Sequence, residues 1–179
     1  MVAFVSWLES GGKQVKHQVA PSSEWSAPQP AFFKANWDAA IDKDNSKVGI
    51  GVIVRDSEGL VMASLCSSIT LNPNPLLGEA VEALRATTLC AELGLTQIVL
   101  DGDALNVVQA VQSEEKNWST FGIVIRDVKS LLSKVREGSI QHTPREFNVF
   151  AHTLANYALT CSEDCILLED YPPCIQHLL

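Results

Sequence analysis

The chain has 179 residues, five cysteines and a formal net charge of −8, with a pI near 4.9. This length allows one compact domain, and the odd number of cysteines indicates reduced thiols. The acidic net charge excludes a protein that binds nucleic acid through a large basic surface, so any binding of nucleic acid should be weak or local. No stretch approaches the roughly 20 apolar residues of a membrane span, and the apolar run 2–8 lacks the basic flank of a signal peptide, so we expect an intracellular protein, cytoplasmic or nuclear and not secreted.

The first predicted elements form a meander of three strands. Residues 1–31 are rich in turn formers and show no lasting periodicity, so they are expected to be a flexible lead-in and linker before a domain over residues 32–160. Apolar alternation then predicts strands over residues 33–40, 48–55 and 60–69.

After Pro75 the apolar period becomes helical, and it ends at Gly94. The stripe consists of Ala80, Ala83, Leu84, Thr87 and Ala91. Later segments predict a buried strand at 97–100, helices at 104–111 and 121–135, a strand at 139–143 and a closing helix at 148–159. The order βββαβααβα predicts an α/β fold with a five-stranded mixed sheet flanked by helices, followed by a C-terminal tail over residues 161–179.

A rotation of about 100° per residue decides which polar residues on the helices matter. With the apolar stripe toward the core, Glu79 borders the sheet, whereas Glu82 should face water. The same count on the closing helix puts His152 at a border from which it could reach the strand ends.

Two aspartates belong to the same set. Asp103 follows the buried strand, where open α/β sheets place their sites, although it could instead be the N-cap of the next helix. Asp38 stands mid-strand, and a buried acid there needs a partner, for which a metal ion is a candidate. Asp38, Glu79, Asp103 and His152 are therefore the candidate catalytic and metal-binding residues, because carboxylates from separate elements can hold hard divalent cations.

Five ordered segments carry a resemblance to a known family. They are Lys34-Ala35-Asn36-Trp37-Asp38-Ala39-Ala40, Gly49-Ile50-Gly51-Val52-Ile53-Val54-Arg55-Asp56, Gly78-Glu79-Ala80, Asp101-Gly102-Asp103-Ala104-Leu105-Asn106-Val107-Val108, and Pro144-Arg145-Glu146-Phe147-Asn148 followed by Ala151-His152 and Leu154-Ala155. Over about residues 33–160 the chain resembles the plant-type ribonuclease H-like domain of the type 1 ribonuclease H family, found alone and at the ends of retrotransposon reverse-transcriptase reading frames.

The resemblance implies a metal-dependent endonuclease that cleaves the RNA strand of RNA–DNA hybrids. In that family three acids hold two magnesium ions, and these roles are implied for Asp38, Glu79 and Asp103. The family frame also favours Glu79 over Glu82, because Glu79 stands fifteen residues before the helix-ending Gly94.

Two positions depart from the magnesium enzymes of the family. His152 stands where type 1 enzymes have a fourth aspartate, although it resembles many plant members, and imidazole suits manganese better than magnesium. The expected cofactors are therefore two ions of Mg²⁺ or Mn²⁺. Ala39 replaces the glycine of many relatives and adds a methyl group where backbone should approach the substrate.

Candidate nucleic-acid contacts are Ala39, Asn74, Arg145 and Asn148. Asn74 is also a natural turn residue, and Asn148 is equally plausible as the cap of the closing helix. His142, in the last predicted strand, is interpreted as structural.

Three functional classes remain open for what is expected to be a monomer. The first is the hybrid ribonuclease; the second is a nucleic-acid- or protein-binding module that kept the fold and lost efficient chemistry; the third is a 3′–5′ exonuclease. The third ranks last, because such exonucleases carry Asp-x-Glu on the first strand and this chain has Asp38-Ala39-Ala40. The tail holds Cys161, Cys165, Cys174 and His177, but their spacing matches no usual zinc pattern.

Overall fold

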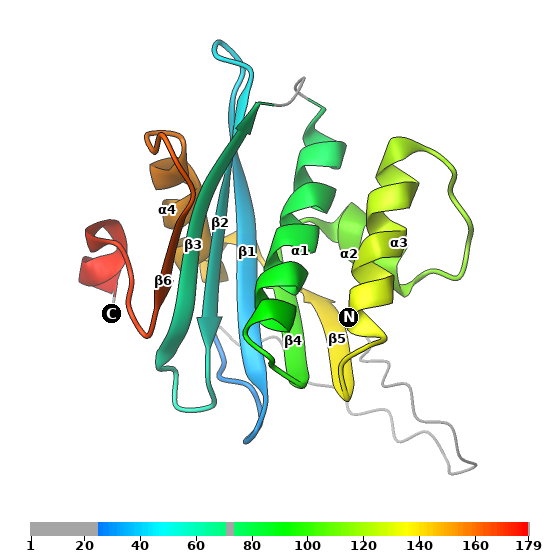
Figure 1. The fold of residues 1–179 in the computed structure, drawn as a ribbon, viewed down its shortest axis with the longest axis horizontal. Helices are drawn as coiled ribbons and strands as arrows, with labels where there is room; N and C mark the ends of the chain where they lie inside the picture. The colour runs from blue at the N-terminus through cyan, green and yellow to red at the C-terminus, as the bar shows by residue number, and fades with distance from the viewer. Residues whose placement is uncertain (1–24, 71–73, 179) are drawn as a thin grey trace.

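The computed structural model describes residues 25–70 and 74–178, and its elements follow the predicted order (Figure 1). Its strands are β1 (Phe33–Asp42), β2 (Lys47–Arg55), β3 (Val61–Thr70), β4 (Gln97–Gly102), β5 (Glu137–His142) and β6 (Cys165–Leu168). Its α-helices are α1 (Pro75–Glu92), α2 (Leu105–Gln112), α3 (Thr120–Leu132) and α4 (Val149–Ala158), and its 3-10 turns are η1 (Arg145–Phe147) and η2 (Pro173–Leu178). Most of the predicted lead-in lies outside the described residues. Among the described helices, none is long and apolar enough to cross a bilayer.

The strands form one mixed sheet in the order β5-β4-β1-β2-β3-β6. The first three strands pair antiparallel, while β4 runs parallel to both β1 and β5. The predicted α/β order is therefore confirmed, with one correction: β6, from the predicted tail, pairs antiparallel with β3 and makes the described sheet six-stranded. A four-residue strand at a sheet edge is too short to show a period of its own.

Helix α1 has signals for both its ends in the local sequence. Asn74 is the N-cap, and its side-chain oxygen accepts from the backbone N–H of Leu77 at 3.3 Å. Pro75 follows in the first turn, where its missing N–H costs nothing. At the other end Gly94 has φ of +69°, and Leu95 donates back to Cys90 at 3.0 Å. These caps set the length of the helix that carries Glu79.

The two faces of the sheet are covered by different helices. Helices α1 and α3 stand on one side and α4 on the other (Figure 1). Alternation along β1 sends Ala35 and Trp37 into the main core beneath α1, where both are fully buried. The intervening Asn36 and Asp38 point to the side of α4.

Helix α4 lies in backbone contact with β2. A Cβ at Gly51 would overlap the backbone O of Ala151 and the backbone N of Ala155, and one at Gly49 would overlap the backbone O of Ala155. Asn148, just before the helix, donates from Nδ2 to the backbone O of Trp37 at 2.8 Å and is 1% exposed. The glycines and this hydrogen bond together set the position of α4 against β1 and β2.

Strand β1 extends beyond its neighbour β4. The last pair between the two strands joins Trp37 and Gly102, whereas β1 continues to Asp42. The Trp37 ring lies so close to Gly102 that a side chain there would collide with it. Residues 38–42 therefore pair with β2 along one edge, while their other edge, beyond the end of β4, forms an open notch in the sheet. Helix α1 lies on one face of the sheet at this notch and α4 on the other.

A buried group of polar residues lies under the start of the described chain. The guanidinium of Arg55 stacks on the Trp25 ring at 3.6 Å and faces Phe150 at 4.6 Å. Trp25 Nε1 and Arg55 Nη2 both donate to Asn36 Oδ1, at 3.0 and 2.9 Å. Arg55 is 4% exposed, and its burial lowers its pKa to about 10. Trp25, at the start of the described part of the predicted linker, is thus packed against the sheet, whereas most of residues 26–31 are exposed.

We expect Gly51→Ala to destabilise the protein by about 2–3 kcal/mol, because its new methyl group would push α4 away from β2. Urea denaturation monitored by tryptophan fluorescence measures the change.

The matched control is Gly78→Ala in α1, where the nearest atom to an added Cβ is Val48 Cγ1 at an ordinary 3.7 Å. Alanine there should stabilise the protein by roughly 0.5–1 kcal/mol, because it reduces the freedom of the unfolded chain. Equal effects of the two substitutions would contradict the close packing of α4.

Candidate functional site

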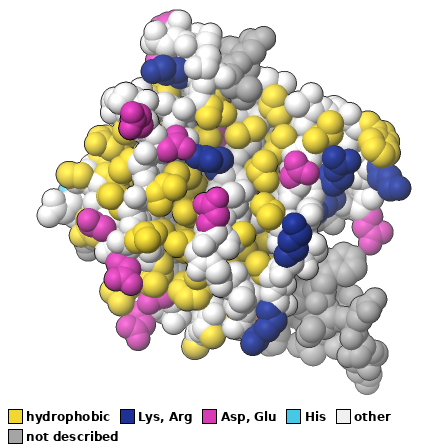
Figure 2. Space-filling view, viewed as in Figure 1, with side chains coloured by type: hydrophobic (Ala, Val, Ile, Leu, Met, Phe, Trp, Pro, Cys, Tyr) yellow, Lys and Arg dark blue, Asp and Glu magenta, His cyan; other side chains and the backbone are white. Residues whose placement is uncertain are grey.

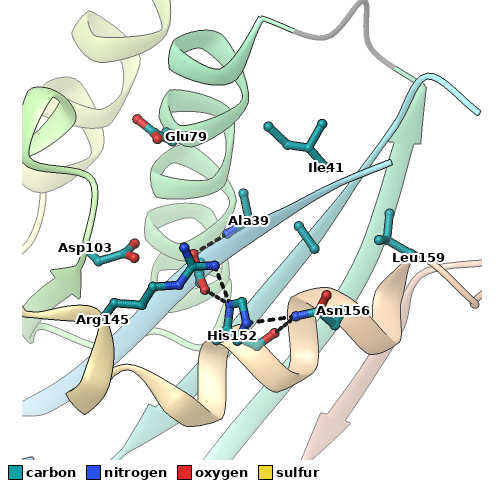
Figure 3. Close-up of a pocket in the computed structure, with 10 residues that line it drawn as sticks. Ala39, Ile41, Glu79, Asp103, Arg145, His152, Asn156 and Leu159 are labelled. Carbon is teal, nitrogen blue, oxygen red and sulfur yellow. Dashed lines mark hydrogen bonds and ion pairs between the residues drawn. The ribbon is translucent and has the colours of Figure 1, made fainter. Parts of the chain in front are cut away.

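The notch beside β1 opens into a pocket of about 370 Å³. In Figure 3, Glu79 stands on α1, Asp103 beyond the end of β4, and His152 on α4, around one hollow. Its lining residues are Asp38, Ala39, Ala40, Ile41, Glu79, Asp103, Arg145, His152, Asn156 and Leu159. All four predicted site residues therefore face the same pocket from four separate elements.

Asp38 is the most buried of these acids, with 5% of its surface exposed. Its Oδ1 accepts from the backbone N–H of Ala39 at 2.8 Å, and its Oδ2 lies 2.7 Å from His152 Nδ1. Burial raises the pKa of Asp38 to about 6, and the charge of Asp103 adds to that rise. The hydrogen bonds from His152 and Ala39 act in the opposite direction but do not cancel it.

Three polar side chains contact the ring nitrogens of His152. Asn156 Nδ2 lies 3.2 Å from His152 Nε2 and also donates to the backbone O of His152 at 2.8 Å. An amide nitrogen can only donate, so the Asn156 contact favours an acceptor at Nε2 and a proton on Nδ1, where Asp38 can accept it. Arg145 Nη2 lies 3.2 Å from the same Nδ1. A guanidinium can only donate, so this contact requires an acceptor at Nδ1 and competes with the bond from Nδ1 to Asp38.

Asp103 does not cap the following helix. The N-cap of α2 is Ala104, without a side-chain cap bond, so the carboxylate of Asp103 is left to the pocket. His142 Nε2 donates to the backbone O of Asp103 at 3.1 Å, which agrees with the structural role predicted for His142. Asp101 lies elsewhere, 2% exposed, with its Oδ2 3.5 Å from Lys34 Nζ.

The two glutamates of α1 have different surroundings, and one prediction was wrong. Glu79 lines the pocket, and its pKa is raised by burial and by the charges of Asp103 and Asp38. Glu82 was expected to face water but is fully buried, and neither of its carboxylate oxygens has a hydrogen-bond partner. The predicted apolar stripe was too narrow: a Cβ at Gly78 would lie 4.0 Å from Glu82 Oε1 and 3.7 Å from Val48 Cγ1, so this flank of α1 also lies against β2. Burial raises the pKa of Glu82 well above its ordinary value, and the charges of Asp38, Glu79 and Asp103 add to this.

The acids share a pocket but do not yet form a coordination sphere. In residues 25–70 and 74–178, no three His, Cys, Asp or Glu side chains stand close enough together to hold a metal ion. The types of donor nevertheless suit a hard divalent cation. The charge of Asp103 raises the pKa of both Asp38 and Glu79, so a cation among the three would relieve their mutual repulsion.

The predicted nucleic-acid contacts occupy different kinds of position. Ala39 and Arg145 line the pocket, whereas Asn74 is exposed and caps α1, as expected of a turn residue. Asn148 must be corrected: it is buried, makes no side-chain cap bond to α4 and instead binds the backbone O of Trp37. Its amide nitrogen is therefore already engaged by the backbone of β1, while its Oδ1 is buried without a hydrogen-bond partner.

The sequence reasoning missed two residues beside the acids. Asn156 follows His152 by four positions on a helix, and that spacing alone predicts neighbouring side chains. The burial of Glu82 could not be anticipated in this way, because it depends on how that flank of α1 lies against β2.

Comparisons with known proteins identify both the family and the fold. Residues 36–158 match the sequence profile of the family described as reverse transcriptase-like. No protein with a curated description matches the chain. Among solved structures, RNase H1 of the archaeon Halobacterium salinarum NRC-1 is 24% identical with a TM-score of 0.65, covering 72% of this chain and 98% of its own.

Two further solved structures are similar. An N-terminal RNase H domain from Mycobacterium tuberculosis is 21% identical with a TM-score of 0.64, over 72% of this chain and 94% of the other. LC11-RNase H1, solved with an RNA/DNA hybrid, is 18% identical with a TM-score of 0.60, over 72% of this chain and 96% of the other. These similarities confirm that the fold is RNase H-like.

The buried carboxyl of Glu82 leads to a prediction on stability. In the folded protein Glu82 keeps its proton to well above pH 4.5, whereas in the unfolded chain it ionises near that pH. In the unsubstituted protein, the free energy of unfolding therefore falls as pH rises. The substitution Glu82→Gln removes this dependence on pH. We expect the variant to gain stability over the parent by up to about 1.4 kcal/mol per pH unit above pH 4.5, until the folded protein also ionises.

Denaturant titrations between pH 4 and pH 8 measure this difference. The control is Glu92→Gln, at the exposed end of the same helix, which should change stability by less than about 0.5 kcal/mol. A difference between Glu82→Gln and the parent that stays constant with pH would contradict the buried, neutral state of Glu82.

Proposed function

The chain belongs to the reverse transcriptase-like family, and on that premise we propose that it is a metal-dependent endonuclease that cleaves the RNA strand of RNA–DNA hybrids. One observation carries the proposal: Asp38, Glu79 and Asp103, from three separate elements, line one pocket. The RNase H-like fold supports it only as an analogy, because folds host many functions and the site must carry the argument.

Asp38, Glu79, Asp103 and His152 would hold the cofactor, expected to be two Mg²⁺ or Mn²⁺ ions. Such ions supply an activated water and stabilise the charge that develops on the cleaved phosphate. The protein's own residues prepare the place: Ala39 holds Asp38 through its backbone N–H, and Asn156 fixes the ring of His152. Arg145, exposed at the mouth of the pocket, offers a guanidinium to a phosphate.

The distribution of charge supports local binding of a nucleic acid. On the face shown in Figure 2, basic side chains gather on the side of α3, and acidic ones are more frequent toward β3 and β6. A groove of about 560 Å³ beside α2 and α3 is lined by three cations, Lys116, Arg126 and Lys129, by two acids, Glu114 and Glu115, and by Trp118, which is 76% exposed. Cations beside an exposed aromatic ring suit a nucleic-acid strand, through phosphate contacts and base stacking.

We expect the protein to cleave a labelled RNA–DNA hybrid when Mg²⁺ or Mn²⁺ is present. Asp38→Asn and Asp103→Asn should each reduce cleavage at least about 100-fold, because a bound ion contributes several kcal/mol to the transition state. Circular dichroism checks that the variants remain folded.

The control is Asp127→Asn, an exposed carboxylate on α3, which should leave the cleavage rate unchanged. Equal activity of the parent, Asp38→Asn and Asp103→Asn would place the catalytic site elsewhere.

His152 should determine the preferred metal. Imidazole gives a neutral nitrogen where a carboxylate would give an anionic oxygen, which weakens binding of hard magnesium more than of manganese. We expect faster cleavage with Mn²⁺ than with Mg²⁺, and His152→Asp should narrow the difference by at least several-fold through a faster magnesium reaction. Cleavage rates that are equal with both metals in the unsubstituted protein and unchanged in His152→Asp would show that His152 does not bind the metal. Its role would then be limited to the hydrogen bond with Asp38.

A second candidate is a binding module that kept the fold and lost efficient chemistry. Two observations favour it: within residues 25–70 and 74–178 no three acidic or imidazole side chains are placed to share an ion, and Oδ2 of Asp38 is hydrogen-bonded to His152. Hybrid binding without cleavage in either metal, measured in the same assay, would select this function over the nuclease.

A further inference from the structure

Four of the five cysteines gather at one place, away from the acidic pocket. Cys66 lies in β3, Cys161 beyond the end of α4, Cys165 in β6 and Cys174 in η2. They pack into a small apolar cluster with residues of β2, α4 and η2, namely Ile53, Leu154, Ala158 and Ile175. All of these thiols are free. Segments far apart in the sequence therefore bring four oxidisable groups together.

The register of the sheet selects one pair among the four. Strands β3 and β6 are antiparallel, and Cys66 is the direct partner of Cys165. Such partners point to the same face with their Cβ atoms about 4.5–5.5 Å apart, whereas a disulfide needs about 3.5–4.5 Å. Because β6 is a four-residue strand at the edge of the sheet, a small inward shift would close this difference.

The two partners differ in access to solvent. Cys66 is fully buried, and burial raises the pKa of its thiol to about 12, with further contributions from Cys174, Cys161 and Cys165. Cys165 is half-buried and can be reached from solvent. A soluble oxidant therefore meets Cys165 first, and the protected Cys66 reacts second.

The tail that carries Cys165 is already held beside β3 by polar contacts. Asp164 pairs with Arg85 of α1 and accepts from Ser67 Oγ at 2.5 Å. Further along, Ser64 Oγ donates to the backbone O of Asp170 at 3.0 Å. These contacts keep the two thiols opposite each other before any bond forms.

We propose that Cys66 and Cys165 form a reversible disulfide that attaches the C-terminal strand covalently to the sheet. The site is separate from the acidic pocket, so the inference does not depend on the proposed nuclease activity. Because Cys66 and Cys165 are direct partners across two antiparallel strands, the formation of a disulfide is the chemistry that their placement suits.

Glutathione disulfide is a sufficient oxidant. The Cys165 thiolate attacks one of its sulfurs, forms a mixed disulfide and releases one glutathione. Cys66 then loses its proton and attacks the Cys165 sulfur, and the second glutathione leaves. The two cysteines lose two electrons and two protons, which glutathione disulfide takes up as it becomes two glutathione molecules.

The test is to incubate the folded, reduced protein with glutathione disulfide, block the remaining thiols by alkylation and map the linked peptides by mass spectrometry. We expect a loss of two hydrogen atoms per chain and a peptide joining Cys66 to Cys165, both reversed by dithiothreitol. The oxidised protein should melt roughly 5–10 °C higher than the reduced protein, because the bond closes a long loop of the unfolded chain.

Variants separate this bond from the others that the cluster allows. Cys165→Ser should abolish both the mass change and the shift in melting temperature, whereas Cys161→Ser, Cys174→Ser and Cys90→Ser should retain them. A linked peptide joining Cys161 to Cys165 or to Cys174, oxidation only after denaturation, or tightly bound zinc in the reduced protein would each overturn the proposal.

Discussion

The backbone contact between α4 and β2 is the constraint on which the site depends. Gly49 and Gly51 remove the side chains that would hold the helix away, and Asn148 ties its start to the backbone of Trp37. The neighbour of Gly51 across the sheet is Asp38, so the same close approach brings His152 within 2.7 Å of that carboxylate. If side chains at these positions held α4 further from β2, Asp38 would lose its hydrogen bond to His152.

The burial and mutual repulsion of the acids in and beside the pocket lower the stability of the fold. Asp38 and Glu79 are placed where burial and neighbouring charge raise their pKa, and Glu82 lies buried beside them without a hydrogen-bond partner. Buried acids of this kind are stabilised by a proton or by a cation. The gathering of these acids thus lowers the stability of the fold, as is common where charged groups are brought together for function.

Much of this architecture could be predicted from the sequence, because the period of apolar residues changes clearly between strands and helices. The three-stranded meander, α1 and the strand before Asp103 were all predicted. The sequence also predicted that four side chains would face one pocket, namely Asp38, Glu79, Asp103 and His152.

What escaped prediction depends on contacts between distant segments. The burial of Glu82 comes from the flank of α1 that lies against Val48 of β2, and that of Asn148 from the approach of α4 to β1. Strand β6 is defined by its partner β3, since four residues carry no periodic signal.

The stack of Trp25 on Arg55 bears on where the folding unit of this family begins. The part of the chain that is similar to the family spans residues 36–158. Yet Arg55, deep in that part, is covered by a ring that precedes it, and β3 is covered by a strand that follows it. A fragment cut at the limits of sequence similarity would expose a buried guanidinium at one end and an unpaired strand edge at the other. Sequence similarity marks the part of the domain that relatives share. The domain that folds as one unit also includes the flanking segments particular to this chain, which cover its buried groups and its sheet edge.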